Sequence, residues 1–213
     1  MLELLLAGWL CLPLAPINPV RQDTLDIMAV QIFGGAHTGN ETVHTGPTVG
    51  LKYEVLPVHP LVLRSGLEYR FGQVRGLNLP AGDLHELYAS ADVIYYRGTN
   101  RLTGYLGVGL LIGFASFSPL ESVRDSLLDL DWGLDPNDPI TQFDVDTETE
   151  WGYRLTLGLR FRETVSFEIN ITEIRPQFIY RVSTRDLNRT EIREEFRNNS
   201  FNVTFGYVIS ILE

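Results

Sequence analysis

A run of twelve residues, WGYRLTLGLRFR from Trp151 to Arg162, alternates without a break between two kinds of side chain. Its odd positions are all aromatic or leucine, and its even positions are glycine, threonine or arginine. Successive side chains of a strand point to opposite faces of a sheet, so a period of two predicts a strand with one apolar and one polar face. Taken alone, this strand fits a soluble sandwich, a lipocalin-like barrel or a membrane barrel.

Seven further segments carry strand signals, and most of them alternate in the same way. The expected strands cover 25–33, 48–55, 61–71, 84–97, 101–117, 151–162, a segment from 165 onward, and 201–212. In the seventh, the apolar parity reverses past Glu173, which predicts either a bulge or a strand that has left the bilayer. The connections alternate between long and short, as in a barrel with tight turns on one side of a membrane and extended loops on the other.

The size of the lumen indicates which face points inward. An eight-stranded barrel has an interior just wide enough for side chains to fill. The glycine, threonine and serine positions, interleaved with charges, suit that narrow space better than the many large apolar residues do. Aromatic residues near the strand ends fit the interfacial girdles of membrane barrels; they are Trp151, Tyr153, Phe161, Phe71, Tyr95 and Phe201. The sequence therefore predicts an all-β fold, an eight-stranded antiparallel up-and-down transmembrane β-barrel.

The N-terminal segment is expected to be separate from this barrel. Residues 4–15 have the length of a secretory hydrophobic region and are too short to span a bilayer as a helix, although no Lys or Arg precedes Arg21. We expect residues 1–20 to be a signal peptide and leader, and 24–213 to form a single barrel domain. Removal of the leader would take away Cys11, the only cysteine.

This organisation resembles the small bacterial outer-membrane barrels of the OmpA, OmpX and OmpW type. The resemblance covers 25–212 and includes a final strand, FNVTFGYVISIL, of the kind that the barrel-assembly machinery recognises, although the chain ends on Glu213 and not on an aromatic residue. It implies a monomer in the bacterial outer membrane, in contact with outer-membrane lipid and lipopolysaccharide. The net charge of −10 argues against a nucleic-acid partner, since binding phosphates needs a concentrated basic face.

Ionisable side chains of both signs fall on the predicted lumen face. We expect a lumenal charge network that acts as a salt-bridged plug, because unpaired charges are costly where water is restricted. An ion path is the alternative. The network comprises Glu54, Arg64, Glu68, Arg70, Glu86, Asp92, Arg154, Arg160 and Glu168.

The longest expected loop, 118–150, holds ten acids and one arginine. Its start, Ser118 to Glu121, has the form of a capping box, and apolar residues at helical spacing then predict a short amphipathic helix ending near Gly133. Its acids could gather a divalent cation, but their spacing does not match an EF-hand loop, and a solvated acidic extracellular loop is expected instead. The acids singled out are Asp129, Asp131, Asp135, Asp138, Asp144 and Asp146.

The leading functional hypothesis is a non-catalytic outer-membrane barrel with a structural or surface-interaction role through its loops, with no cofactor or metal. A narrow channel or conduit for small hydrophobic molecules, a lipid A-modifying enzyme and a soluble ligand-binding barrel remain alternatives. For the enzyme, the only candidate bases are His85 with Glu86, or His37 and His44. No serine, histidine and acid fall into a catalytic pattern, so an enzyme is not expected.

Overall fold

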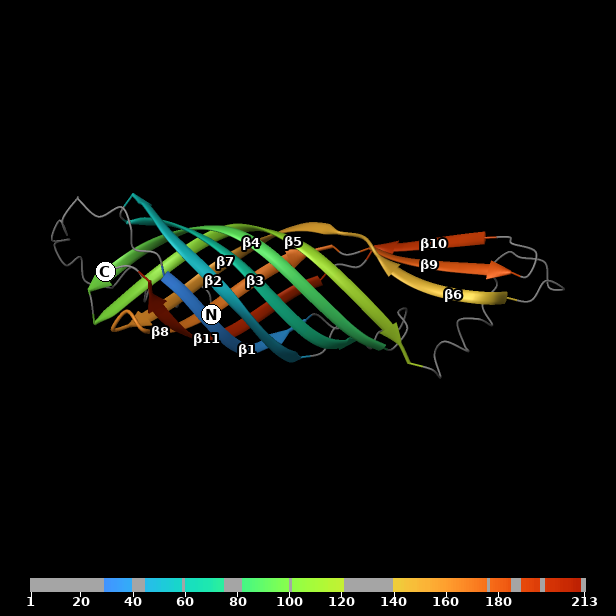
Figure 1. The fold of residues 1–213 in the computed structure, drawn as a ribbon, viewed down its shortest axis with the longest axis horizontal. Helices are drawn as coiled ribbons and strands as arrows, with labels where there is room; N and C mark the ends of the chain where they lie inside the picture. Colours follow the sequence, from blue (N-terminus) through green and yellow to red (C-terminus); the bar gives the residue numbers. More distant parts are fainter. Residues whose placement is uncertain are drawn as a thin grey trace.

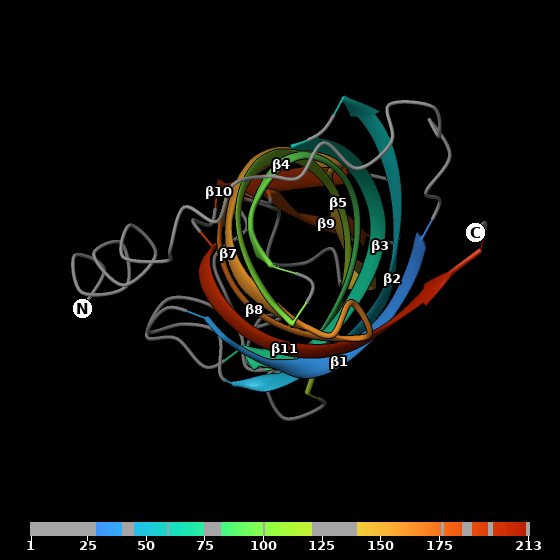
Figure 2. The same cartoon turned by 90° about the vertical axis from the view of Figure 1, so that its left-hand side faces the viewer.

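In the computed structural model of the chain, eight strands form a closed antiparallel barrel (Figures 1 and 2). The structure describes residues 29–39, 45–58, 60–74, 82–99, 101–120, 140–175, 177–184, 189–195 and 198–211. Around the barrel the order is β1-β11-β8-β7-β5-β4-β3-β2, and pairing of β1 with β11 closes the ring. Within the described ranges no helix is long and apolar enough to cross a membrane. The predicted all-β barrel of eight strands is confirmed.

Most strands of the barrel run longer than their sequence signals. Their bounds are β1 Ala29–Thr38, β2 Gly46–Val58, β3 Leu61–Val74, β4 Gly82–Thr99, β5 Leu102–Pro119, β7 Glu150–Phe161, β8 Val165–Ile174 and β11 Asn198–Ser210. The segments 34–38, 46–47, 72–74 and 82–83 were expected to be loop and are strand. Backbone pairing with a neighbouring strand sustains these ends where apolar alternation has stopped, as in the β3 and β4 pairs up to Val74 and Gly82.

The distribution of side chains is inverted relative to a soluble protein. The largest fully buried side chains include Arg64, Arg70, Arg154 and Lys52. Many leucine, isoleucine, valine and aromatic side chains are exposed instead; Leu110, for example, is 62% exposed. Such an outer surface is stable only where water is absent, because each exposed apolar side chain would be unfavourable in water. The opening alternation therefore faces lipid with its apolar side, as the sequence predicted.

Apolar layers and a charged middle follow one another along the lumen. On the inner face of β5, Tyr105 lies in a layer with Val62 and Ile94 near the short-turn end, and Leu111 lies in a layer with Tyr88. Two glycines, Gly107 and Gly109, separate these two layers: Gly107 leaves room for Ile94, and Gly109 leaves room for the carboxylate of Asp92. The lumen is therefore a packed core with its own polar centre.

Three further strands form a second sheet that was not predicted as such. Strands β6 (Ile140–Thr147), β9 (Gln177–Thr184) and β10 (Arg189–Glu195) pair in the order β10-β9-β6 and project beyond the long-loop end of the barrel (Figure 1). The parity reversal past Glu173 is explained by this sheet: β8 ends at Ile174, and β9 begins a strand outside the barrel. Of the two alternatives for that segment, a strand that has left the bilayer is correct.

An apolar cluster joins the projecting sheet to the barrel. Phe178 of β9 packs edge-on against Phe117 of β5, with ring centroids 5.5 Å apart, and Val182 lies in the same buried cluster. Val74 and Leu84, the last inward-facing residues of β3 and β4, complete it from the barrel side. The cluster lies at the long-loop mouth of the lumen and fixes the base of the sheet there.

Candidate functional site

The predicted lumenal charge network is brought together inside the barrel, with one addition. Eight of the nine residues singled out are buried, and the side chain of the ninth, Arg160, is 12% exposed. The structure adds Lys52, which is fully buried on the inner face of β2. Alternate positions along each strand supply these charges because side chains two residues apart share a face.

Glu168 is the centre of the network near the short-turn end. It is completely buried, and its Oε1 accepts hydrogen bonds from Arg64 at 2.9 Å and from Tyr105 at 2.8 Å. Gln31 donates a third hydrogen bond to the same oxygen at 3.0 Å, and Lys52 pairs with Oε2. Four donors around one carboxylate replace its hydration shell, which makes the buried charge tolerable.

Glu68 has the same role one level closer to the long-loop end. Arg70 donates to its Oε1 at 2.6 Å, and Arg154 donates to its Oε2 at 3.1 Å. Thr48 and Asn202 also donate to Oε1, at 3.1 and 3.0 Å. This second hub therefore ties β2, β3, β7 and β11 together across the lumen.

Asp92 connects the two hubs. Its Oδ2 lies 2.5 Å from the guanidinium of Arg154 and 3.5 Å from that of Arg64. At the short-turn mouth Arg160 pairs with Glu54 at 2.7 Å, and Glu54 in turn lies 4.0 Å from Arg64. The ion pairs thus form a continuous chain of alternating sign from the short-turn mouth into the outer half of the lumen.

The charges in this network balance. With Lys52 included, five cations face five carboxylates: Lys52, Arg64, Arg70, Arg154 and Arg160 against Glu54, Glu68, Glu86, Asp92 and Glu168. Glu86 accepts a hydrogen bond from Tyr88 at 2.6 Å, and the guanidinium of Arg70 lies over that tyrosine ring at 4.5 Å. A neutral, closely paired lumen is what a space with little water requires.

Two glycines on the lumen face are required by this packing. A Cβ at Gly158 would meet the ring of Tyr105, and a Cβ at Gly109 would meet the carboxylate of Asp92. Both glycines therefore make room for side chains of the network, which links the glycine-rich polar faces of the sequence to the chemistry of the lumen.

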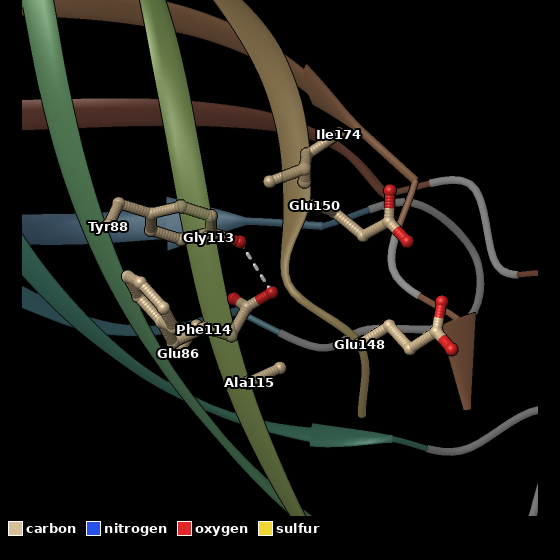
Figure 3. A pocket seen from close by; sticks show the side chains of 8 residues that line it. All are labelled: Glu86, Tyr88, Gly113, Phe114, Ala115, Glu148, Glu150 and Ile174. Atoms are coloured by element: carbon tan, nitrogen blue, oxygen red, sulfur yellow. Dashed lines mark hydrogen bonds between the residues drawn. The ribbon is translucent and has the colours of Figure 1, made fainter. Parts of the chain in front are cut away.

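A second site lies where the barrel wall is incomplete. Strand β5 pairs with β7 only as far as Gly113 and Glu150, whereas β5 continues to Pro119 paired with β4. A recess of about 10 Å³ lies at this gap, and Figure 3 shows the carboxylates of Glu86, Glu148 and Glu150 around it. A volume of this size accommodates about one water molecule.

The predicted acidic loop is partly a strand. Asp144 and Asp146 belong to β6, where cross-strand pairing places Asp144 opposite Arg181 of β9. Asp129, Asp131, Asp135 and Asp138, and most of the helix expected between Ser118 and Gly133, lie outside the described residues. Ser118 and Pro119 belong to β5, so they do not form the expected capping box. In the described ranges no group of three or more His, Cys, Asp or Glu residues could hold a metal ion.

The outward polar face of the projecting sheet carries an exposed ion-pair network. Arg181 bonds to Glu191 at 3.2 Å and also pairs with Asp146, while Arg193 bonds to Glu191 at 2.6 Å and to Glu148 at 2.8 Å. The hydrogen bonds from Arg193 and Arg181 hold the pKa of Glu191 below its ordinary value. This surface is polar and solvated, unlike the lipid-facing wall below it.

The two candidate catalytic histidines in the described ranges, His37 and His85, do not share a site. His85 and Glu86 are consecutive on β4 and therefore lie on opposite sides of the wall, with Glu86 buried in the lumen. The His85 Nδ1 is hydrogen-bonded to the Tyr69 hydroxyl at 2.6 Å, and its ring lies 5.0 Å from that of Phe71. His37 is buried in the lumen, and His44 lies outside the described residues.

Several members of the network were missed by sequence reasoning. Lys52 occupies a polar position of an alternating strand, so its inward direction was readable, but its pairing with Glu168 depends on β2 and β8 meeting across the lumen. Tyr88 and Tyr105 were harder to assign, because a tyrosine suits both a lipid girdle and a buried hydrogen bond. Gln31 lies in the strand with the loosest alternation.

Comparisons with known proteins agree with this fold. No protein-family model matches the chain, and no curated protein matches it in sequence. The outer membrane protein OprG from Pseudomonas aeruginosa is similar in structure, with a TM-score of 0.55 and 15% identity over 86% of this chain and 96% of that one. Neisserial surface protein A has a TM-score of 0.51 and 14% identity over 86% of this chain and 97% of that one.

The structural alignments include nearly all of both of these proteins. At such low sequence identity, the likeness concerns the fold alone. Together with the apolar outer wall and the polar lumen, it identifies the architecture. The chain is an eight-stranded transmembrane β-barrel with the fold of the small bacterial outer-membrane proteins.

Proposed function

We propose that this protein is a non-catalytic barrel of the bacterial outer membrane whose lumen is closed to ions and whose projecting sheet serves interactions at the cell surface. The observation that carries the proposal is the neutral ion-pair chain that fills the lumen from Arg160 to Arg70. An ion crossing the barrel would have to displace buried pairs, and breaking one such pair costs about 3–5 kcal/mol.

The projecting sheet supports the second half of the proposal. Barrels of this kind have short turns on the periplasmic side and longer loops outside the cell, so we expect β6, β9 and β10 to lie outside. The apolar side of the sheet is anchored on the barrel mouth, and its ion-paired side is exposed. A rigid, charged sheet held clear of the lipid is suited to contacts with surface polysaccharide or with other cells.

Conductance in a planar bilayer tests the closed lumen. Purified wild-type protein is expected to give no steady conductance in KCl, whereas Arg154→Ala, which removes the guanidinium shared by Glu68 and Asp92, is expected to give openings. Thr141→Ala on the exposed face of β6 is the matched control and should behave as wild type. Steady wild-type conductance equal to that of the Arg154 variant would contradict the proposal.

Cysteine labelling in intact cells tests the surface location of the sheet. Cys11 is the only native cysteine, so a Cys11→Ser background carries a single introduced site. Gln142→Cys on β6 should react with a membrane-impermeant maleimide in intact cells. Thr164→Cys, in the turn before β8, should react only after the outer membrane is permeabilised. The reverse pattern would place the sheet in the periplasm and refute the surface role.

The gap between β5 and β7 favours a second candidate, a lateral conduit for small hydrophobic molecules. Its recess has room for only about one water molecule, so passage would require the two strands to separate further. Thr147 hydrogen-bonds to the Ala115 carbonyl beside the gap. A disulfide between Ala115→Cys and Thr147→Cys should abolish uptake of a hydrophobic fluorophore by vesicles, and reduction should restore it. Equal uptake with the disulfide formed and with it reduced would refute the lateral conduit.

A further inference from the structure

One wall of the lumen carries only small uncharged polar side chains over several residues. On the inner face of β11, Ser200, Asn202 and Thr204 are all buried and are followed by Gly206. Gln31 of β1 lies against Gly206, because its Nε2 is the nearest atom that a Cβ there would meet. These side chains, with Gln31, are called the polar column below. The charged network lies beside the polar column, and its ion pairs cross the rest of the lumen.

Three oxygen atoms in the polar column are buried without a protein hydrogen-bond partner: Gln31 Oε1, Asn202 Oδ1 and Thr204 Oγ1. Their orientation is fixed, since the Gln31 amide nitrogen donates to Ser166 at 2.8 Å and the Asn202 amide nitrogen donates to Glu68 at 3.0 Å. Both amides thus turn their nitrogens to fixed partners and leave their carbonyl oxygens without one. Buried polar atoms of this kind are satisfied by ordered water in native proteins.

The spacing of these oxygens suits a chain of single water molecules. Asn202 and Thr204 occupy alternate positions of one strand, so their Cα atoms are about 7 Å apart, and Gln31 reaches the level of the next inward position. Two hydrogen bonds through one water span about 5.5–6 Å. One or two waters between neighbouring side chains would therefore join all three oxygens.

The column begins beside a cavity at the short-turn mouth and ends beside Arg70. At the short-turn mouth a cavity of about 180 Å³ is lined in part by Ala29 and Val208, the inward positions that precede Gln31 on β1 and follow Gly206 on β11. At the other end the Ser200 hydroxyl accepts a hydrogen bond from Arg70 at 2.7 Å, in the outer half of the lumen. The column thus spans the level at which the charged network closes the rest of the lumen.

We propose that a file of water molecules fills the polar column and that the barrel passes water while it excludes ions. The column offers three unpartnered neutral oxygens on inward positions about 7 Å apart, and each can accept a hydrogen bond from water. They are too few and too widely spaced to replace the hydration shell of an ion, which would need a ring of oxygens around it. This activity goes beyond the proposed surface role and does not depend on it.

Osmotic shrinkage of phosphatidylcholine vesicles containing the full-length protein, followed by stopped-flow light scattering, tests the proposal. Wild-type protein should accelerate shrinkage over protein-free vesicles. Thr204→Val keeps the shape of the side chain but removes its hydroxyl, and should lose most of the protein-dependent rate, whereas Thr204→Ser should keep it. Thr141→Val is the control: it makes the same change on the exposed face of β6, outside the barrel, so the rate should stay at the wild-type value.

Unfolding in urea gives a readout that is independent of permeation. If the Thr204 hydroxyl is hydrated, Thr204→Val, which exchanges only the hydroxyl for a methyl group, should unfold at a lower urea midpoint than wild type; a higher midpoint would show a hydroxyl without a partner and would overturn the proposal. Wild-type shrinkage no faster than that of protein-free vesicles would also overturn it, and would leave the closed lumen intact. Potassium conductance accompanying the water flux would refute both ion exclusion and the closed lumen.

Discussion

Removing the charge of Glu168 should be among the most destabilising conservative changes in the barrel. Glu168→Gln keeps the shape of the side chain but leaves Lys52 and Arg64 as buried cations without their main counter-charge. Breaking a buried pair by neutralising one partner costs about 3–5 kcal/mol. Arg64 retains Asp92 at 3.5 Å, so most of the loss should arise at Lys52.

The matched double variant separates the ion pair from the rest of the site. Lys52→Met alone removes a buried cation and leaves Glu168 short of one donor, and it should cost about as much as the glutamine variant. Lys52→Met combined with Glu168→Gln restores neutrality and should cost much less than the two single changes added together. The coupling free energy should reach about 2–3 kcal/mol, near the upper end for residues in contact.

Equilibrium unfolding in lipid vesicles, followed by tryptophan fluorescence and by heat-modifiable migration on gels, gives the three free energies of unfolding. Trp151 is 69% exposed on the lipid side of β7 and reports insertion directly. If the two single variants add within about 0.5 kcal/mol, the pair does not interact energetically and the neutral plug is refuted. A glutamine variant as stable as wild type would contradict it as well.

Three other predictions follow from the wall, the glycines and the projecting sheet. Leu157→Arg places a charge on the lipid face of β7 and should destabilise the barrel by about 2–4 kcal/mol near the bilayer midplane, measured by unfolding in vesicles; an unaffected variant would mean that the faces are reversed. Gly158→Ala should lower the urea midpoint because its Cβ would meet a tyrosine ring of the network, whereas Gly34→Ala meets only ordinary contacts and should not; equal midpoints would refute the packing. Bonding to Arg193 and Arg181 lowers the pKa of Glu191 in the folded sheet. The contribution of this carboxylate to stability is small, because the site is exposed and screened by salt. That contribution is complete above the unfolded pKa of about 4.3 and is lost as the pH falls through the folded pKa. Limited proteolysis of β10 should therefore accelerate only in acid, and acceleration between pH 7 and pH 5 would contradict this assignment.

The barrel wall was predictable from the sequence because alternation is a local property. The alternation within a strand indicates by itself which side chains point inward and which point outward. The lipid side of the stretch from Trp151 to Phe161 could therefore be predicted without knowing which strands pair with it. The ends of the strands could not be read in this way. Gly34 to Thr38 of β1 looked like a loop, and pairing with β2 and β11 makes the segment a strand.

The second sheet was hidden for a different reason. Strand β6 lies in a segment whose many acids suggested a solvated loop, and its partner β9 is distant in sequence. Only the parity reversal past Glu173 indicated that the chain leaves the barrel there. Within the lumen, the sign and direction of each charge were readable, but its partner was not, because an ion pair such as Arg64 with Glu168 depends on which strands face each other across the lumen.

The balance of lumenal charges divides the electrostatics of this protein into two independent parts. Five cations and five carboxylates of the lumenal network cancel, so the net charge of −10 belongs to residues outside that network. The segment 118–150, which runs in the sequence from the end of β5 to the start of β7, contains ten acids and one arginine and carries most of it. Charges in the lumen are desolvated and decide whether the barrel is stable, whereas exposed ion pairs contribute little to stability. Reversing exposed charges on β6 or β10 should therefore alter what binds at the cell surface and leave unfolding nearly unchanged. Neutralising one lumenal charge should do the opposite, which makes the two sets of variants experimentally separable.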